Sequence, residues 1–161
     1  PTMATYERSV RVAAPLAEVW EFHSTGEGLK ALTPDWMNLR IEEARGPDGE
    51  PDPEVLEEGA VLESSVRPFD VGPRQTWDSE IVAREETDGS AYFRDRMRDG
   101  PFDEWEHTHL FFADGEETIT TDSVVYEFPL GALGRAVGPL AVVGFEPMFL
   151  YRHRQTKALL E

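Results

Sequence analysis

Hydrophobic and polar positions alternate along most of this chain, a pattern that predicts β-strands with one buried face. Glycines, prolines and Asp-Gly pairs separate the alternating stretches, so we expect a meander of antiparallel hairpins. The expected strands cover residues 6–12, 39–44, 61–66, 75–85, 91–97, 105–113 and 117–128. A stretch rich in acids, prolines and glycines, residues 46–59, is expected to be an exposed and mobile loop.

Helical spacing replaces the alternation in two places. Pro15 suits the first turn of a helix, and the apolar positions that follow it are three to four residues apart up to His23; a second short helix is expected over residues 27–32. Near the C-terminus the same spacing predicts one long helix through Leu140, Val143, Met148, Tyr151, Ala158 and Leu159. The element order therefore predicts an α+β fold in which a curved sheet grips one long helix, with space between the two.

The composition limits the classes of protein that this chain can represent. Its 161 residues suit one domain, and the hydrophobic share of 40% is enough for a packed core. A formal net charge of −17 opposes binding to nucleic acid and to anionic membranes. The chain has no cysteine, which excludes disulfides and thiolate chemistry. The longest apolar stretch, about 13 residues, is shorter than the roughly 20 that a membrane span needs, so we expect a cytoplasmic protein without membrane insertion.

The acids occur throughout the chain, while Lys30 and Lys157 are its only lysines. An acid-rich, lysine-poor surface is typical of proteins that work in molar salt, where the Debye length is about 3 Å and self-repulsion is screened. A dedicated acidic face for a cationic partner would instead predict clustered acids. We interpret the charge as an adaptation to a halophilic habitat.

The most informative strand is the one that contains both His107 and His109. These histidines share a strand face with Trp105 and Phe111 because side chains alternate, and the acids of the same strand lie on the opposite face. We therefore expect the imidazoles to face inward. A tight turn at Asp114-Gly115 would give pairs whose numbers sum to 229, which places His107 opposite Asp122 and His109 opposite Thr120.

The preceding hairpin has a looser loop, so two registers compete. A sum of 202 places Phe93, Asp95 and Met97 on the inner face, whereas a sum of 201 would bury Arg94 and Arg96 at a large desolvation cost. We prefer 202, which sets His107 between Asp95 and Asp122.

Three interpretations of this inward row stay open. It can be a satisfied polar network within the sheet, the floor of a cavity that orients the polar end of a ligand, or an acid–base pair or metal site. The other histidines, His23 and His153, belong to no recognisable motif, and we expect no metal and no cofactor. The serines lie outside nucleophile-elbow patterns, and no glycine loop has a phosphate-binding spacing.

Several of these residues together resemble a known family. The resemblance rests on Pro15 to Trp20, Phe93, Asp95, Gly100-Pro101-Phe102, Trp105, His107, His109, Phe111, Asp122, Tyr126, Pro129 and Tyr151-Arg152-His153-Arg154. The chain resembles the START-like SRPBCC superfamily, also called the helix-grip or polyketide cyclase/dehydrase and lipid-transport superfamily, and within it the cell-division-inhibitor-like subgroup. The resemblance implies a seven-stranded sheet around the C-terminal helix with an apolar cavity, and it covers nearly the whole chain. We interpret Pro1 and Thr2 as a remnant of expression, so that one domain spans residues 3–161.

The resemblance implies no established reaction for the subgroup. We lean towards a non-catalytic protein that binds a small apolar molecule, such as a lipid, isoprenoid or polyketide, between the sheet and the helix. The alternatives are a cyclase- or dehydratase-type enzyme and a surface interaction module; the oligomeric state stays open. The candidate acid–base residues are His107, His109, Asp95 and Asp122. The candidate ligand contacts are Trp36, Phe69, Trp77, Phe93, Met97, Trp105, His107, His109, Asp122, Met148 and Tyr151.

Overall fold

The computed structural model describes residues 3–128 and 142–161, and it contains one antiparallel sheet of seven strands in the order β1-β7-β6-β5-β4-β3-β2. Each strand pairs with its neighbour in sequence, except that β1 closes against β7. The strands are β1 (Ala4–Val12), β2 (Arg40–Arg45), β3 (Val61–Val66), β4 (Gln75–Glu86), β5 (Ser90–Arg98), β6 (Glu104–Asp114) and β7 (Glu117–Glu127).

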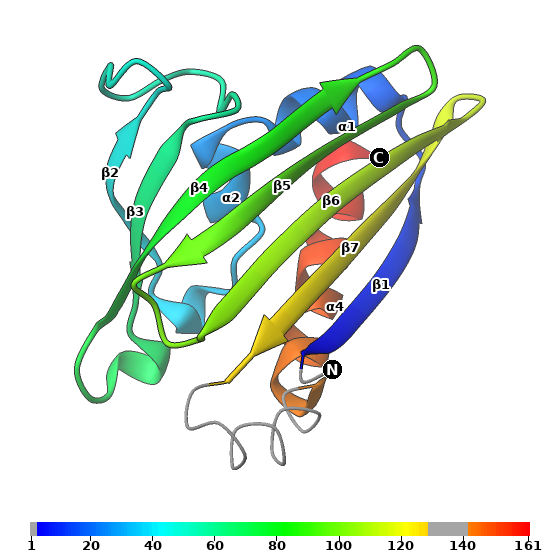
Figure 1. Cartoon of the computed structure of the whole chain (residues 1–161). Helices are drawn as coiled ribbons and strands as arrows, with labels where there is room; N and C mark the ends of the chain where they lie inside the picture. Colours follow the sequence, from blue (N-terminus) through cyan, green and yellow to red (C-terminus); the bar gives the residue numbers. More distant parts are fainter. Residues whose placement is uncertain (1–2, 129–141) are drawn as a thin grey trace.

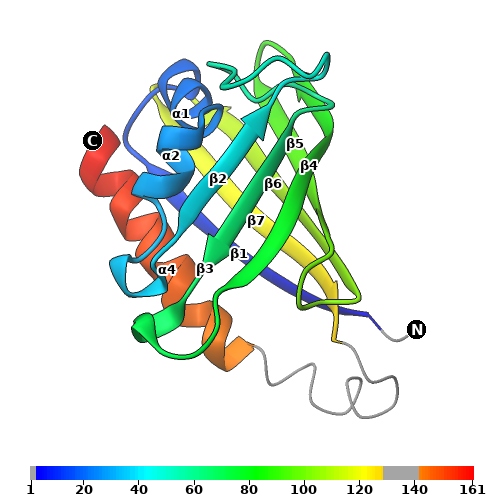
Figure 2. The same ribbon diagram turned by 90° about the vertical axis from the view of Figure 1, so that its left-hand side faces the viewer.

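The helices of the described residues lie on one side of this sheet. Two short α-helices connect β1 to β2, and the long C-terminal helix runs across the strands (Figures 1 and 2). These are α1 (Leu16–His23), α2 (Gly26–Ala31) and α4 (Val142–Leu160), with the 3₁₀ turns η1 (Asp35–Met37) and η2 (Pro68–Asp70). The predicted helix-grip arrangement is confirmed; Leu140, which we expected in the last helix, lies outside the described residues. None of the helices in the described ranges combines the length and hydropathy needed to cross a bilayer.

Local sequence explains where the short helices begin. Pro15 precedes α1 with an extended backbone, and the carbonyl of Pro15 accepts the first helical hydrogen bonds. Thr25 caps α2, because its hydroxyl accepts a hydrogen bond of 3.1 Å from the amide of Gly28. The acid-rich loop that follows β2 is exposed at most positions, but it is anchored by buried Leu56, whose amide donates to the Ser24 carbonyl at 2.8 Å. One apolar residue thus ties this loop to the end of α1.

The strand register confirms one of the two predictions and corrects the other. Phe93 lies opposite His109 and Asp95 opposite His107, so the sum of 202 is confirmed. In the β6–β7 hairpin the sum is 231, and the predicted 229 is wrong. The reason is the glycine: Gly115 has φ +63 and is the first of two turn residues, with Glu116 the second. Each residue of β6 therefore faces a β7 residue two positions further along than predicted. A shift of two residues keeps every side chain on its expected face but places Asp122 opposite His109.

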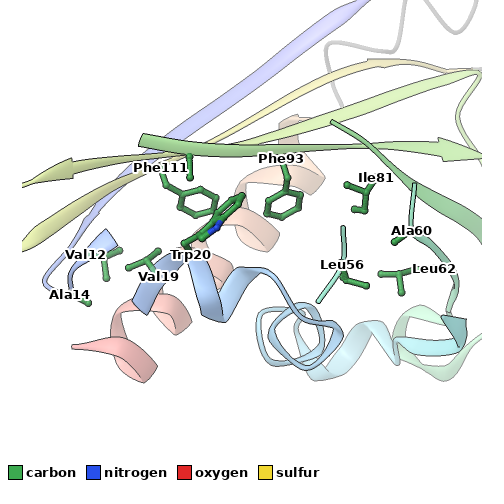
Figure 3. Close-up of a cluster of buried hydrophobic side chains, with 11 residues drawn as sticks. Val12, Ala14, Val19, Trp20, Leu56, Ala60, Leu62, Ile81, Phe93 and Phe111 are labelled. Carbon is green, nitrogen blue, oxygen red and sulfur yellow. The ribbon is translucent and has the colours of Figure 1, made fainter. Parts of the chain in front are cut away.

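Aromatic rings fill the space between the sheet and α1. Trp20 of α1 reaches the rings of Phe93 and Phe111 on the sheet, with ring centroids 6.0 and 5.7 Å away (Figure 3). A second apolar cluster lies under α4, where Phe145 and Phe149 pack on Tyr6 of β1. The two clusters hold α1 and α4 against the same face of the sheet and leave the polar histidine row between them.

Candidate functional site

A cavity of about 180 Å³ lies between the concave face of the sheet and the helices. Its walls come from α1, α2, η1, β3, β4, β5, β6 and α4, and most of the side chains on them are apolar. The polar or charged side chains on the walls are His23, Thr25, Thr33, Ser64, Ser79, Asp95, His107, His109 and Arg152. The space is thus apolar along β3 and α2 and polar where β5, β6 and α4 meet.

The centre of the polar region is the carboxylate of Asp122, whose side chain is 1% exposed. His107 donates from Nε2 to Oδ1 at 2.7 Å, and His153 of α4 donates from Nε2 to Oδ2 at 2.6 Å. The guanidinium of Arg152 adds an ion pair, with Nε 3.4 Å from Oδ1. Burial alone would raise the pKa of Asp122, but the charge of Arg152 and the two imidazole hydrogen bonds outweigh it and hold the pKa well below its usual range.

A second histidine–carboxylate pair lies beside the first. His109 faces Asp122 in the register, yet its Nε2 donates to Asp95 Oδ2 at 2.8 Å. Arg152 donates from Nη2 to His109 Nδ1 at 3.1 Å. The carboxylate can only accept and the guanidinium can only donate, so the proton of His109 is on Nε2 and both of its ring nitrogens are engaged.

The rings of His107, His109 and Phe93 form a stack. The His107 and His109 centroids are 3.7 Å apart, and the His109 and Phe93 centroids are 3.9 Å apart. Burial, and then the neighbouring His107, lower the pKa of His109 to about 4. His109 is therefore neutral at pH 7 and serves to position Asp95 and Arg152.

His23 of α1 approaches the same region from the helix side. Its ring lies 4.7 Å from that of Phe111, and Nδ1 is 2.7 Å from the Val19 carbonyl one helical turn earlier. Burial, and then the charge of Arg152, lower the pKa of His23 to about 3. His23 is also neutral at pH 7, and its Nε2 has no hydrogen-bond partner among the described residues.

The structure brings together most of the residues that the sequence singled out, but not all. Seven of the expected ligand contacts lie on the cavity wall: Trp77, Phe93, Met97, Trp105, His107, His109 and Met148. Asp122 lies behind the wall, because the corrected register carries it under His109 and α4 covers it. Asp95, a candidate acid–base residue only, is on the wall.

The three other expected contacts point elsewhere. Trp36 and Phe69 stack on each other at 4.8 Å across η1 and η2 and are largely exposed. Tyr151 of α4 is half-buried and is not among the residues on the cavity wall.

Sequence reasoning missed three members of the polar region: His23, Arg152 and His153. Each comes from a helix rather than from the strand that carries the histidine pair, so no local spacing connects them. The Tyr151 to Arg154 stretch was part of the family resemblance, and it was the available signal for Arg152 and His153.

Asp95, His107 and His109 also satisfy the spacing of a metal site. Their ligand atoms lie within 4.8 Å of one another. The Arg152 guanidinium, however, donates to His109 and places a fixed positive charge beside these atoms. That charge opposes a cation, and binding one would also break the His109–Asp95 hydrogen bond.

Comparison with known proteins agrees with this arrangement. A profile of the family described as polyketide cyclase / dehydrase and lipid transport matches residues 12–145. The chain belongs to this family. Among curated proteins, no match to this family member was found.

Solved structures resemble this family member in fold. Major latex-like protein 151 from Panax ginseng is 18% identical with a TM-score of 0.66, and the match covers 99% of each chain. A START superfamily protein from Mycobacterium smegmatis is 18% identical with a TM-score of 0.63, covering 96% of this chain and 98% of that one. Truncated norcoclaurine synthase from Thalictrum flavum is 17% identical with a TM-score of 0.68, and the match covers 99% of this chain and 94% of that one. At these identities the likeness shows the shared fold.

The Asp122 cluster predicts a large stability effect. We expect Asp122→Asn to lower the free energy of unfolding by about 3–5 kcal/mol. The substitution removes a buried negative charge to which the Arg152 guanidinium and the imidazoles of His107 and His153 are bound. Asp114→Asn is the matched control: Asp114 pairs with Arg11 at the surface, and its loss should cost less than about 1 kcal/mol. Urea unfolding of both variants measures the difference; equal small effects would contradict the central role of Asp122.

The buried neutral histidines predict a pH dependence. The folded-state pKa of His23 is about 3 against 6.5 for the free side chain, so below pH 6.5 the unfolded chain takes up a proton that the folded protein does not. Stability should therefore fall as pH falls from 6.5 towards 3, by about 1.4 kcal/mol per pH unit for this residue. The free energy of unfolding can be measured with urea at about pH 6 and pH 5, in about 1 M KCl to screen the acids. Its change per pH unit should be smaller in His23→Gln than in the wild type by about 1.4 kcal/mol. An unchanged slope would contradict the assignment.

Proposed function

We propose that this protein binds a small, mainly apolar molecule in the cavity between the sheet and α4. The observation that carries the proposal is the cavity itself: an apolar space inside a domain this small is kept open by aromatic walls on one side and a rigid polar network on the other. Close packing normally removes such space, since unfilled volume costs stability. An open space with polar groups at one end is the usual form of a ligand site.

The size of the cavity limits the ligand. About 180 Å³ is below the roughly 300–1,000 Å³ typical of sites for drug-sized molecules. A one- or two-ring compound, or an isoprenoid of similar size, suits it. Burying about 200 Å² of apolar ligand surface contributes about 5 kcal/mol, which is comparable to the cost of association. The polar contacts therefore decide whether binding is tight.

The relatives support a cavity function of this kind. The family description names lipid transport beside cyclase and dehydrase chemistry. One solved norcoclaurine synthase structure, 15% identical, holds dopamine and hydroxybenzaldehyde, which are small aromatic compounds. We also propose the finer assignments: membership of the cell-division-inhibitor-like subgroup, a cytoplasmic location, and a surface adapted to high salt.

Catalysis is a second candidate, and one observation favours it. His107 is hydrogen-bonded through Nε2 to a buried, ionised Asp122, and it lies on the cavity wall. This is the arrangement in which a carboxylate orients an imidazole as a general base. His109 cannot act in this way without losing a partner, because both of its nitrogens are engaged. Of the two histidines His107 and His109, we therefore propose only His107 as the general base.

Ligand binding predicts thermal stabilisation. In a screen of aromatic hydrocarbons, phenols, isoprenoid alcohols and fatty acids, at least one compound at about 100 times its Kd should raise the Tm by about 5–10 °C. Met97→Trp places a larger side chain at the cavity wall and occupies part of the cavity, so it should abolish the rise in Tm. Arg96→Trp is the control, since Arg96 is exposed on the outer face of the same strand. If no compound shifts the Tm and native mass spectrometry finds no co-purified molecule, ligand binding is excluded.

The catalytic candidate predicts proton abstraction from a bound carbonyl compound. With 2-tetralone in D₂O, the protein should accelerate exchange of the protons next to the carbonyl, and His107→Gln should remove about 100-fold or more of the acceleration. Proton NMR follows the exchange. An exchange rate equal to that of buffer, or unchanged in His107→Gln, would rule out His107 as a base.

A further inference from the structure

A buried hydrogen-bond acceptor at the polar end of the cavity has no donor among the described residues. The backbone carbonyl of Val19 can only accept, so its 2.7 Å contact requires the proton of His23 to be on Nδ1. The other nitrogen, Nε2, is then an acceptor, and it is buried on the cavity wall without a partner among the described residues. A buried polar atom left in this state costs free energy that a bound donor recovers.

Asp95 adds a further acceptor. Asp95 uses Oδ2 to accept from His109, and the pKa of Asp95 is lowered: burial opposes ionisation, but the His109 hydrogen bond and the nearby imidazoles outweigh it. An ionised carboxylate has lone pairs to spare and no proton to offer. Asp95 lies on the cavity wall, as His23 does.

The charges of the region oppose an anionic ligand. Arg152 is the only Lys or Arg among the described wall residues, and it already contacts Asp122 and His109. The lowered pKa values of His23 and His109 keep both neutral at pH 7, and Arg152 is the fixed positive charge beside the carboxylates of Asp95 and Asp122. A ligand carboxylate would add a third negative charge, and the apolar walls would desolvate any charged group that enters.

We infer that the ligand enters with a neutral hydrogen-bond donor, a hydroxyl of a phenol or alcohol, whose proton is donated to the acceptors at this end of the cavity, His23 Nε2 first, and that carboxylates are rejected. This inference rests on the proposed binding function and adds the chemical class of the ligand. Among compounds small enough for the cavity, it separates those that carry a hydrogen-bond donor from those that do not.

Three two-ring probes of similar size test the inference by isothermal titration calorimetry on the wild-type protein. These are 2-naphthol, which donates; 2-methoxynaphthalene, which only accepts; and 2-naphthoate, which is an anion. We expect 2-naphthol to bind at least tenfold more tightly than 2-methoxynaphthalene, a difference of about 1.4 kcal/mol, and 2-naphthoate to bind more weakly than both. Equal affinities of the naphthol and its ether, or tightest binding of the naphthoate, would overturn the inference while leaving the binding function intact. Failure of all three to bind would overturn the inference, and the binding function would fall with it only if the thermal screen and native mass spectrometry also find no ligand.

Two matched variants locate the preference. His23→Phe keeps a ring in place and removes the acceptor, so the preference for 2-naphthol over its ether should fall at least threefold. Thr120→Val is the control: Thr120 Oγ1 is likewise buried and unpartnered among the described residues, but Thr120 is not on the cavity wall. Thr120→Val should keep the wild-type preference. A preference that survives His23→Phe, or that Thr120→Val abolishes, would contradict donor recognition at His23.

Discussion

One buried carboxylate organises the interior of this protein. Asp122 of β7 receives hydrogen bonds from β6 and α4 and an ion pair from α4, so it fastens the helix to the middle of the sheet. Neutralising or removing one partner would leave the others unpaired in a medium where water cannot replace them. Asp122 thus fixes the middle of α4 beside the space between helix and sheet.

The same network separates the roles of two histidines that the sequence cannot tell apart. His107 and His109 are two residues apart on one strand face and stack on each other. The carboxylates that they bind are the diagonal ones rather than those directly opposite in the register. Arg152 then occupies the remaining nitrogen of His109, while that of His107 stays available. Neighbouring elements, not the strand itself, decide which imidazole can meet a ligand.

The sequence predicts the fold well because alternation and turn residues are local signals. In the part of the chain that the structure describes, the seven strands and the helices α1, α2 and α4 occur where the pattern places them, within a few residues. The register between β6 and β7 was predicted one pair out of place, because a glycine next to an aspartate suits either position of a two-residue turn. Three residues of the polar site were missed for a different reason: His23, Arg152 and His153 approach from helices distant in sequence, and only the packed structure brings them to the histidine row.

The attachment of α4 bears on how molecules can reach the interior. Near its start, Glu146 accepts from Tyr6 and Arg8 of β1, and at its end Lys157 donates to the Arg11 carbonyl. Asp122 holds the middle, so α4 is fastened at three points along its length. Leu29, Leu32 and Val66 line another part of the cavity with apolar side chains. Displacing α4 would therefore break three sets of polar contacts, whereas displacing α2 would break mainly dispersion contacts, each of which is small.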